Sequence, residues 1–135
     1  STHIFGIKYL FRYFKGRKNM SKTEAVSNVC PMELGINILS GKWKLRILWN
    51  LYIKKVVRFN ELQRNLGNIT TKTLTEQLRE LEDKKIIKRT IYPEIPPKVE
   101  YSLTDIGSSI EPVLKTLCDW GNDYLELIND NTGKV

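Results

Sequence analysis

Two short amphipathic segments joined by a tight turn constrain the fold of this chain most. The second segment, residues 70–82, carries Leu74, Leu78 and Leu81 at the spacing of one helix face, so that face is expected to enter a core. Thr70 is a suitable N-cap, because its hydroxyl can accept a hydrogen bond from a first-turn amide that has no partner in the helix. The opposite, outward face is polar and consists of Lys72, Thr73, Thr75, Glu76 and Arg79.

The first segment, residues 59–66, is predicted to be a helix with Phe59, Leu62 and Leu66 on one face. Asn60 and Gln63 resemble a capping box at its start. The turn that follows contains Gly67. Two short helices with such a turn indicate a helix-turn-helix over residues 59–84, whose second helix is suited to the major groove of DNA. An ordinary helical hairpin in a small helical domain is the alternative.

Charge is segregated along the chain. Residues 1–19 hold five basic groups and no acid, and residues 20–41 have a net charge of −1. Residues 42–98 hold fourteen Lys and Arg against six acids, for a net charge of +8, whereas residues 99–135 have a net charge of −5. A polyanion would therefore be attracted to the block that contains the helix-turn-helix and repelled by the C-terminal block.

Two alternating segments follow the second helix. Residues 86–92 and 99–103 alternate like strands, and the proline-rich turn at 93–97 can continue neither. A hairpin placed directly after the second helix predicts a wing over residues 86–103. Arg89 and Lys98, near its ends, would be able to reach phosphates or the neighbouring minor groove.

Two helices are expected before the helix-turn-helix. Pro31 suits the first position of a short helix that runs to about Leu39, and Gly41 ends it. The helix that follows, around Trp43 to Leu51, is apolar over most of its girth, so it is predicted to be central and buried.

The C-terminal part is predicted to hold a cap, a short turn and a long helix. Thr104 caps a turn that ends at Gly107, and Ser109 is placed to cap the last helix, which leaves Pro112 in its first turn. A long apolar stripe follows, and a partner subunit is its expected cover, although packing within one subunit is the alternative. The predicted dimer interface consists of Ile110, Val113, Leu114, Leu117, Trp120, Tyr124 and Ile128.

These elements predict a mainly α fold with a small β-hairpin wing: a winged helix-turn-helix with a C-terminal dimerisation helix. Residues 20–135 are expected to form one domain, with dimerisation helices over 104–128. Residues 1–19 are interpreted as an N-terminal extension without an assigned function. They would be able to form a basic amphipathic helix, but residues 20–24 read like a natural start, so the extension is either native or added to the chain.

The order of several short motifs resembles one family, the HxlR-type winged-helix transcription regulators, which are relatives of the MarR fold. The resemblance covers about residues 28–128. The motifs that carry it are Cys30-Pro31, Gly41-Lys42-Trp43, Arg58 to Leu62, Ile69 to Thr75, Leu78 to Glu82, Pro97 to Thr104, Gly107 and Trp120. The family usually has Gly where this chain has Lys85, so the junction between the recognition helix and the wing is expected to be wound differently here.

The resemblance implies a homodimer that holds two recognition helices about 34 Å apart, in successive major grooves of a near-palindromic operator in double-stranded DNA. Residues of the second helix are the candidates for base edges or adjacent phosphates: Thr71, Lys72, Thr73, Thr75 and Arg79. Five basic residues elsewhere are expected to anchor phosphates and to carry the salt dependence: Lys42, Lys44, Arg64, Arg89 and Lys98.

Cys30 and Cys118 are the two cysteines. Cys30 stands where many members of that family carry a redox-sensing cysteine, and a helix N-terminus beside it would favour the thiolate. It is therefore a candidate sensor of peroxides or of a reactive small-molecule effector, alone or paired with Cys118 of the other subunit. Inert packing is the alternative, and for Cys118 it is the preferred reading.

Other functions have little support in the sequence. His3 is the only histidine and lies in the extension, so neither catalysis nor a metal site is expected, and no cofactor is predicted. No apolar run approaches the ~18 residues of a membrane span, which predicts a cytoplasmic protein. The favoured interpretation is a sequence-specific DNA-binding transcriptional regulator. The alternative is a winged-helix module that binds protein rather than DNA.

Overall fold

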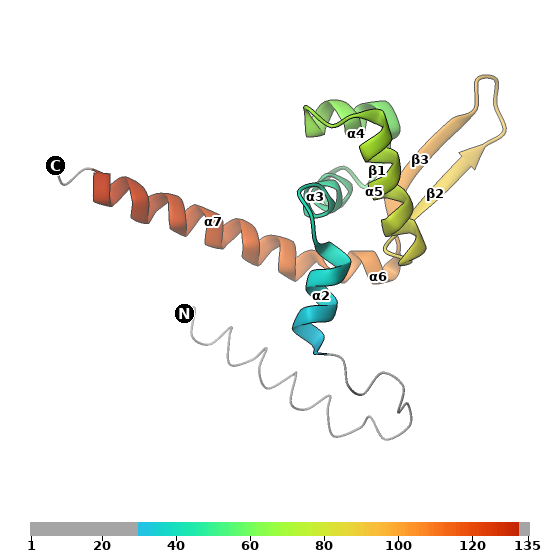
Figure 1. The fold of residues 1–135 in the computed structure, drawn as a ribbon. Coiled ribbons are helices and arrows are strands. Elements are labelled where there is room, and N and C mark those ends of the chain that lie inside the picture. Colours follow the sequence, from blue (N-terminus) through green and yellow to red (C-terminus); the bar gives the residue numbers. More distant parts are fainter. Residues whose placement is uncertain (1–29, 133–135) are drawn as a thin grey trace, which may run out of the picture. The chain divides into compact units, whose positions relative to one another are not determined.

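The structure is a computed structural model that describes residues 30–132. The chain divides into two compact units, Ser1–Gly35 and Ile36–Val135, and α2 (Pro31–Leu39) spans the division. The predicted extension, residues 1–19, lies outside the described residues, and its boundary stays a prediction. Figure 1 shows the other elements: α3 (Lys44–Lys54), β1 (Val56–Arg58), α4 (Phe59–Leu66), α5 (Thr71–Asp83), β2 (Ile87–Tyr92), β3 (Lys98–Leu103), α6 (Asp105–Ser108) and α7 (Glu111–Thr132).

Helix α3 supplies the centre of the core, as its apolar composition predicts. Ile47, Leu48 and Leu51 have no exposed surface. The apolar faces of α4 and α5 enter the same cluster, which confirms the periodicity of both segments. The buried residues of those two helices are Leu62, Leu66, Leu74, Leu78 and Leu81.

The sheet has three antiparallel strands in the order β1-β3-β2. The predicted wing strands are confirmed as β2 and β3, paired from Ile87 opposite Leu103 to Tyr92 opposite Lys98. Strand β1 was not predicted, because three residues are too short to show alternation. Val57 of β1 is buried opposite Tyr101, so this strand fixes the base of the wing to the core.

The turn between α4 and α5 is held by side chains. Thr70 caps α5 as predicted, its hydroxyl accepting from the Thr73 amide at 3.1 Å. The predicted capping box at the start of α4 is wrong: the N-cap is Arg58, and no described side chain caps the helix there. Gln63 instead donates across the turn to the Ile69 carbonyl at 3.2 Å and to the Thr71 hydroxyl at 3.3 Å.

Helix α5 ends in a Schellman motif. The Lys85 amide donates to the Glu82 carbonyl at 2.9 Å, and the Ile86 amide donates to the Leu81 carbonyl at 3.0 Å. Lys85 has φ of 62°, the left-handed conformation that glycine adopts most easily. The expectation of a differently wound junction is therefore wrong, because Lys85 adopts the conformation that a glycine would have there.

Of the two helix caps predicted in the C-terminal part, the one at Thr104 is confirmed and the one at Ser109 is wrong. Thr104 caps α6 as predicted, since its hydroxyl accepts from the Gly107 amide at 3.0 Å. Ser109 does not cap α7: its hydroxyl donates to the Ile106 carbonyl, and α7 begins at Glu111. Pro112 then falls in the first turn of α7, where a missing amide donor costs little.

None of the helices within residues 30–132 is both long and apolar enough to cross a lipid bilayer.

Candidate nucleic-acid interface

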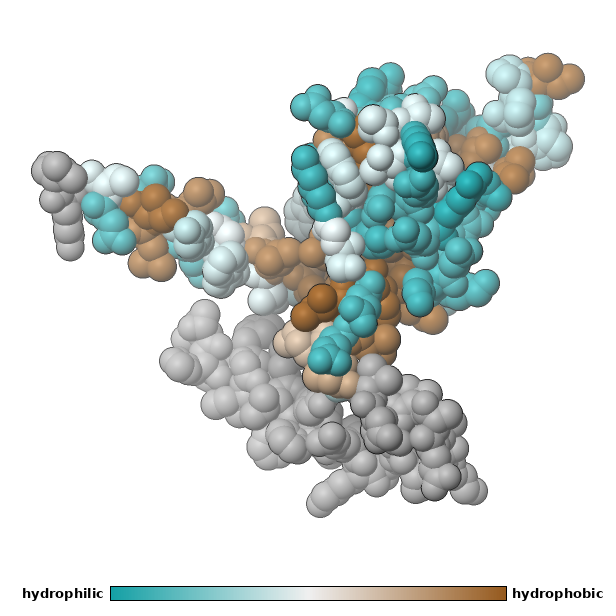
Figure 2. All heavy atoms as spheres, in the orientation of Figure 1, coloured by the Kyte–Doolittle hydropathy of each residue, from teal (hydrophilic) through white to brown (hydrophobic). Residues whose placement is uncertain are grey.

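The outward face of α5 is the centre of the candidate interface. Its Lys72 and Arg79 side chains are exposed, and so is Thr71 at the start of the helix. Thr73 and Thr75 are half-buried on the flanks of this face. Figure 2 shows hydrophilic residues gathered over the part of the molecule that contains α3, α4 and α5. The structure thus presents five predicted base-contact candidates on one helix, anchored from behind by three buried leucines.

The threonine hydroxyls of this helix already have protein partners. Thr75 donates to the Thr71 carbonyl at 2.7 Å, so its only proton is used within the helix. The Thr73 hydroxyl accepts from that of Thr70 at 2.9 Å and keeps its own proton for another acceptor. Thr75 therefore offers a methyl group and an acceptor, whereas Thr73 can also donate.

Lys44 does not belong with the phosphate-anchoring residues. Its side chain is only 9% exposed, and its ammonium group forms an ion pair with Glu80. The same ammonium donates to the Gln77 carboxamide at 2.9 Å. Gln77 and Glu80 both lie on α5, so Lys44 joins the start of α3 to that helix. Its third acceptor is the Ser40 carbonyl at 3.4 Å. The expectation that it binds phosphate is wrong, because a cation buried among protein acceptors is not presented to solvent.

Arg46, which the sequence pattern did not single out, contacts the end of α4. Its guanidinium donates to the carbonyl of Leu66, the last residue of α4, at 2.9 Å. It also lies 4.8 Å from the centroid of the Trp43 ring, and Lys42 lies at the same distance from that ring. The motif around Trp43 thus places Arg46 at the end of α4, and Lys42 shares the Trp43 ring with it. Only the fold reveals this, because Arg46 and Leu66 are twenty residues apart.

Lys42 and Arg64 are exposed, as phosphate contacts require.

The two predicted wing cations face carboxylates of their own chain. Arg89 lies 3.8 Å from Glu82, and Lys98 lies 3.0 Å from Glu100. The hydrogen bond from Lys98 is the largest influence on Glu100 and lowers the pKa of that carboxyl. Each wing cation must therefore be shared with, or released by, its carboxylate before it can bind a phosphate.

The apolar stripe of α7 divides into an inner and an outer part. Leu114 is only 4% exposed within its own subunit, and Ile110 packs against the same core. A side chain buried in this way is not available to a partner subunit. The assignment of Leu114 to the dimer interface is therefore wrong. The outer part is not covered by the other residues that the structure describes: Trp120 is 63% exposed and stacks on Tyr124 at 5.5 Å between ring centroids. Figure 2 shows hydrophobic groups, drawn in brown, along α7. The other exposed stripe residues are Val113, Leu117 and Ile128.

Both cysteines are exposed. Cys30 directly precedes α2, and its carbonyl accepts from the Leu34 amide at 3.0 Å, which confirms its place at the helix start. Cys118 lies on α7. Within residues 30–132 no cluster of His, Cys, Asp or Glu is arranged to hold a metal ion.

Comparison with known proteins identifies the family. The model of the HxlR-like helix-turn-helix family matches residues 38–129. The HTH-type transcriptional regulator BH0655 of Halalkalibacterium halodurans is 44% identical over 109 residues, which cover 80% of this chain and 90% of that protein. The similar solved structures include two redox or transcriptional regulators. The redox regulator HypR in its reduced form has a TM-score of 0.70 at 39% identity, covering 75% of this chain and 99% of HypR. The reduced transcriptional regulator YodB from Bacillus subtilis has a TM-score of 0.63 at 33% identity, covering 71% and 94%.

The winged-helix fold predicted from the sequence is therefore confirmed, and the chain belongs to the HxlR-like helix-turn-helix family of transcriptional regulators.

Proposed function

We propose that the protein is a homodimeric, sequence-specific DNA-binding regulator whose DNA affinity responds to thiol chemistry. One observation carries the DNA-binding part: α5 presents Lys72 and Arg79 outward while its leucine face is buried in the core. Arg79 or Lys72 would read guanine through its O6 and N7 acceptors, and the Thr75 methyl would meet a thymine methyl. Arg64 and Lys42 would contact phosphates, and the wing cations would contribute once their carboxylates release them.

Binding to duplex DNA from the protein's own promoter region tests this part. Arg79→Ala is expected to lower affinity for the preferred duplex by roughly 1–3 kcal/mol and to relax the preference at one base pair. Glu126→Ala, at an exposed position of α7, is the matched control and should bind as the native chain does. Binding without sequence preference and without salt dependence would instead favour a protein-interaction module.

The dimer is supported by the outer apolar residues of α7. Two successive major grooves on one side of a duplex lie about 34 Å apart. Two copies of α5 can enter both grooves only if a subunit contact holds them at that distance. A second copy would cover the Trp120–Tyr124 stack. Trp120→Asp is expected to shift the chain to a monomer in sedimentation experiments and to weaken binding to a two-site duplex. A native chain that sediments as a monomer would refute this part.

Thiol sensing is supported by the exposed Cys30 at the start of α2 and by the similarity to the redox regulator HypR. Peroxide or an electrophile would modify the Cys30 thiol, alone or in a disulfide with the other subunit's Cys118, and change the spacing of the recognition helices. Peroxide treatment is expected to change the affinity of the native chain for its duplex. The affinity of Cys30→Ser for the same duplex is expected to stay unchanged. A full response in Cys30→Ser would end the sensor hypothesis.

A further inference from the structure

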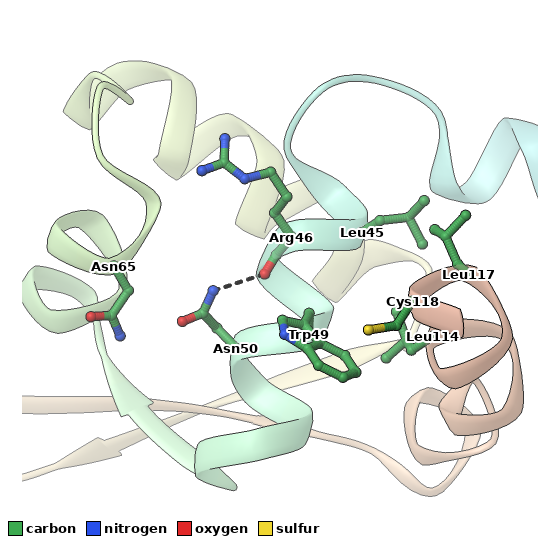
Figure 3. A pocket seen from close by; sticks show the side chains of 8 residues that line it. All are labelled: Leu45, Arg46, Trp49, Asn50, Asn65, Leu114, Leu117 and Cys118. Carbon is green, nitrogen blue, oxygen red and sulfur yellow. Dashed lines mark hydrogen bonds between the residues drawn. The ribbon is translucent and has the colours of Figure 1, made fainter. Parts of the chain in front are cut away.

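Arg46 on α3 carries a guanidinium group that is held in place but not neutralised. One of its N–H groups donates to the Leu66 carbonyl at 2.9 Å, and its central carbon lies 4.8 Å from the centroid of the Trp43 ring. Figure 3 shows that the guanidinium extends away from Trp49, on the next turn of α3. Arg46 is exposed, and no carboxylate in the part of the chain that the structure describes forms an ion pair with it. Its remaining N–H groups are therefore free for another acceptor, in an orientation that is already fixed.

A second cation, Lys42, lies at the same tryptophan. Its ammonium group is 4.8 Å from the centroid of the Trp43 ring, and Lys42 is exposed. Like Arg46, it has no carboxylate partner among the residues that the structure describes, whereas the wing cation Lys98 is paired with its own chain. Two positive charges held around one ring repel each other. An anion that contacts both would relieve this repulsion.

The contact with Leu66 places the Arg46 guanidinium beside the start of α5. Leu66 is the last residue of α4, and the turn that follows leads to Thr71, the first residue of α5. Gln63 closes this turn by donating from α4 to the Thr71 hydroxyl at 3.3 Å. In helix-turn-helix proteins the first residues of the second helix contact base edges, while the helix before it crosses the DNA backbone. The phosphates that border the groove are therefore expected beside this turn, within reach of Arg46.

We propose that Arg46 is a preoriented clamp for one phosphate of the DNA backbone, with Lys42 as the second cation at the Trp43 ring. The inference rests on the proposed DNA-binding function and adds one defined contact to it. A guanidinium can donate to two phosphate oxygens at once, which an ammonium group cannot do in a fixed geometry. Because Trp43 and the Leu66 carbonyl already hold the side chain, Arg46 loses less conformational entropy on binding than a mobile arginine does. A role only as a cap for the end of α4 would need one donor and no charge.

Arg46→Gln separates a phosphate clamp from a helix cap, because a carboxamide can still donate to the Leu66 carbonyl but carries no charge. Its affinity for duplex DNA from the promoter region is expected to fall about fivefold or more, and its slope of log affinity against log salt by about 0.9. Its urea midpoint is expected to stay that of the native chain. Lys115→Gln, which removes one exposed charge from α7, is the matched control and should keep the native slope. An unchanged slope in Arg46→Gln, or an equal reduction in Lys115→Gln, overturns the proposal.

Neutral methylphosphonate linkages, placed one at a time through the protected stretch of the same duplex, locate the contact. At one linkage the native protein is expected to lose affinity about fivefold or more, whereas Arg46→Gln loses less than about twofold there, because its contact is already absent. Arg46→Lys keeps the charge without the fork and is expected to show an intermediate loss at that linkage, which keeps the test valid if the glutamine variant does not fold.

The same linkages separate the clamp from the proposed function. Losses at every linkage that are as large in both Arg46 variants as in the native protein overturn the clamp alone, since the native protein still binds the duplex. A native protein that binds no duplex overturns the proposed function and the clamp with it.

Discussion

The hydroxyl of Thr104 donates to the carbonyl of Lys85, nineteen residues earlier in the chain, across 2.6 Å. The same hydroxyl lies 3.0 Å from the Ile86 carbonyl and accepts from the Gly107 amide at 3.0 Å. Helix α5 ends, β2 begins, β3 ends and α6 begins at this one point. The wing is therefore joined to the end of the recognition helix by side-chain and backbone hydrogen bonds, which fixes the base of the wing against α5.

The close approach at this joint predicts the effect of a methyl group. A Cβ on Gly107 would lie 1.9 Å from the Ile86 carbonyl oxygen, closer than any packing tolerates. We expect Gly107→Ala to lower the free energy of unfolding by about 2 kcal/mol or more, measured by urea denaturation. Gly121→Ala is the matched control: nothing lies near its added methyl, and alanine within α7 should stabilise by about 0.5–1 kcal/mol. Equal stabilities of the two variants would contradict the structure of this joint.

Lys85 supplies a second prediction at the same joint, with the opposite sign. Because its φ of 62° is strained for a residue with a Cβ, Lys85→Gly is expected to raise the free energy of unfolding by about 0.5–1 kcal/mol. Lys84→Gly is the control, since Lys84 has φ of −80° and gains nothing from glycine. Destabilisation by Lys85→Gly, of the same size as that by Lys84→Gly, would show that Lys85 is not left-handed in solution.

The sequence predicted most of the fold because its main signals are local. Helical periodicity located α3, α4 and α5, and alternation located β2 and β3. Contacts between residues far apart in the chain could not be predicted from these local patterns. Lys44 looks like a surface cation beside a helix start, and only the fold brings Glu80 to it. Gln63 likewise looks like a capping residue until Ile69 and Thr71 are folded back against it. The charge block located the candidate interface but did not separate the cations that face solvent from those that hold helices together.

The first turn of α7 predicts a pH dependence. Glu111 accepts hydrogen bonds from Lys115 at 2.6 Å and from the Tyr52 hydroxyl at 2.9 Å, and these bonds lower the pKa of its carboxyl below the ordinary 4.5. A lowered pKa in the folded state contributes stability above pH 4.5 that is lost as the pH falls through the lowered value. Glu111→Gln cannot titrate, so its urea midpoint is expected to fall less than that of the native chain on acidification.

The control for this pH dependence is Glu126→Gln, at an exposed position of the same helix. Its urea midpoint should follow the native curve on acidification. If Glu111→Gln and Glu126→Gln gave the same curve, the Tyr52 and Lys115 hydrogen bonds would not favour the charged form of Glu111 in solution.

Arg64 and Lys44 are predicted to affect DNA binding in physically different ways. Arg64 is exposed on α4, so Arg64→Ala is expected to weaken all duplexes alike and to reduce the slope of log affinity against log salt by about 0.9 for one lost phosphate contact. Lys44 is held by Gln77 and Glu80, so we expect it to make no phosphate contact and to release no counterion from DNA. Lys44→Met should weaken binding by loosening α5 while the salt slope stays unchanged.

The salt slopes of Arg64→Ala and Lys44→Met show whether each side chain contacts a DNA phosphate or instead holds α5 in place. An unchanged slope in Arg64→Ala would remove Arg64 from the phosphate contacts, and a reduced slope in Lys44→Met would return Lys44 to them. Circular dichroism of both variants checks that the helices remain folded. Glu80→Gln offers an independent test, because it weakens the pair with Lys44 and also removes a negative charge from α5. If Lys44 acts only by holding α5, the lost positioning should offset the electrostatic gain. A simple rise in affinity would show that the ion pair does not orient the helix, and that the charge of α5 alone governs binding.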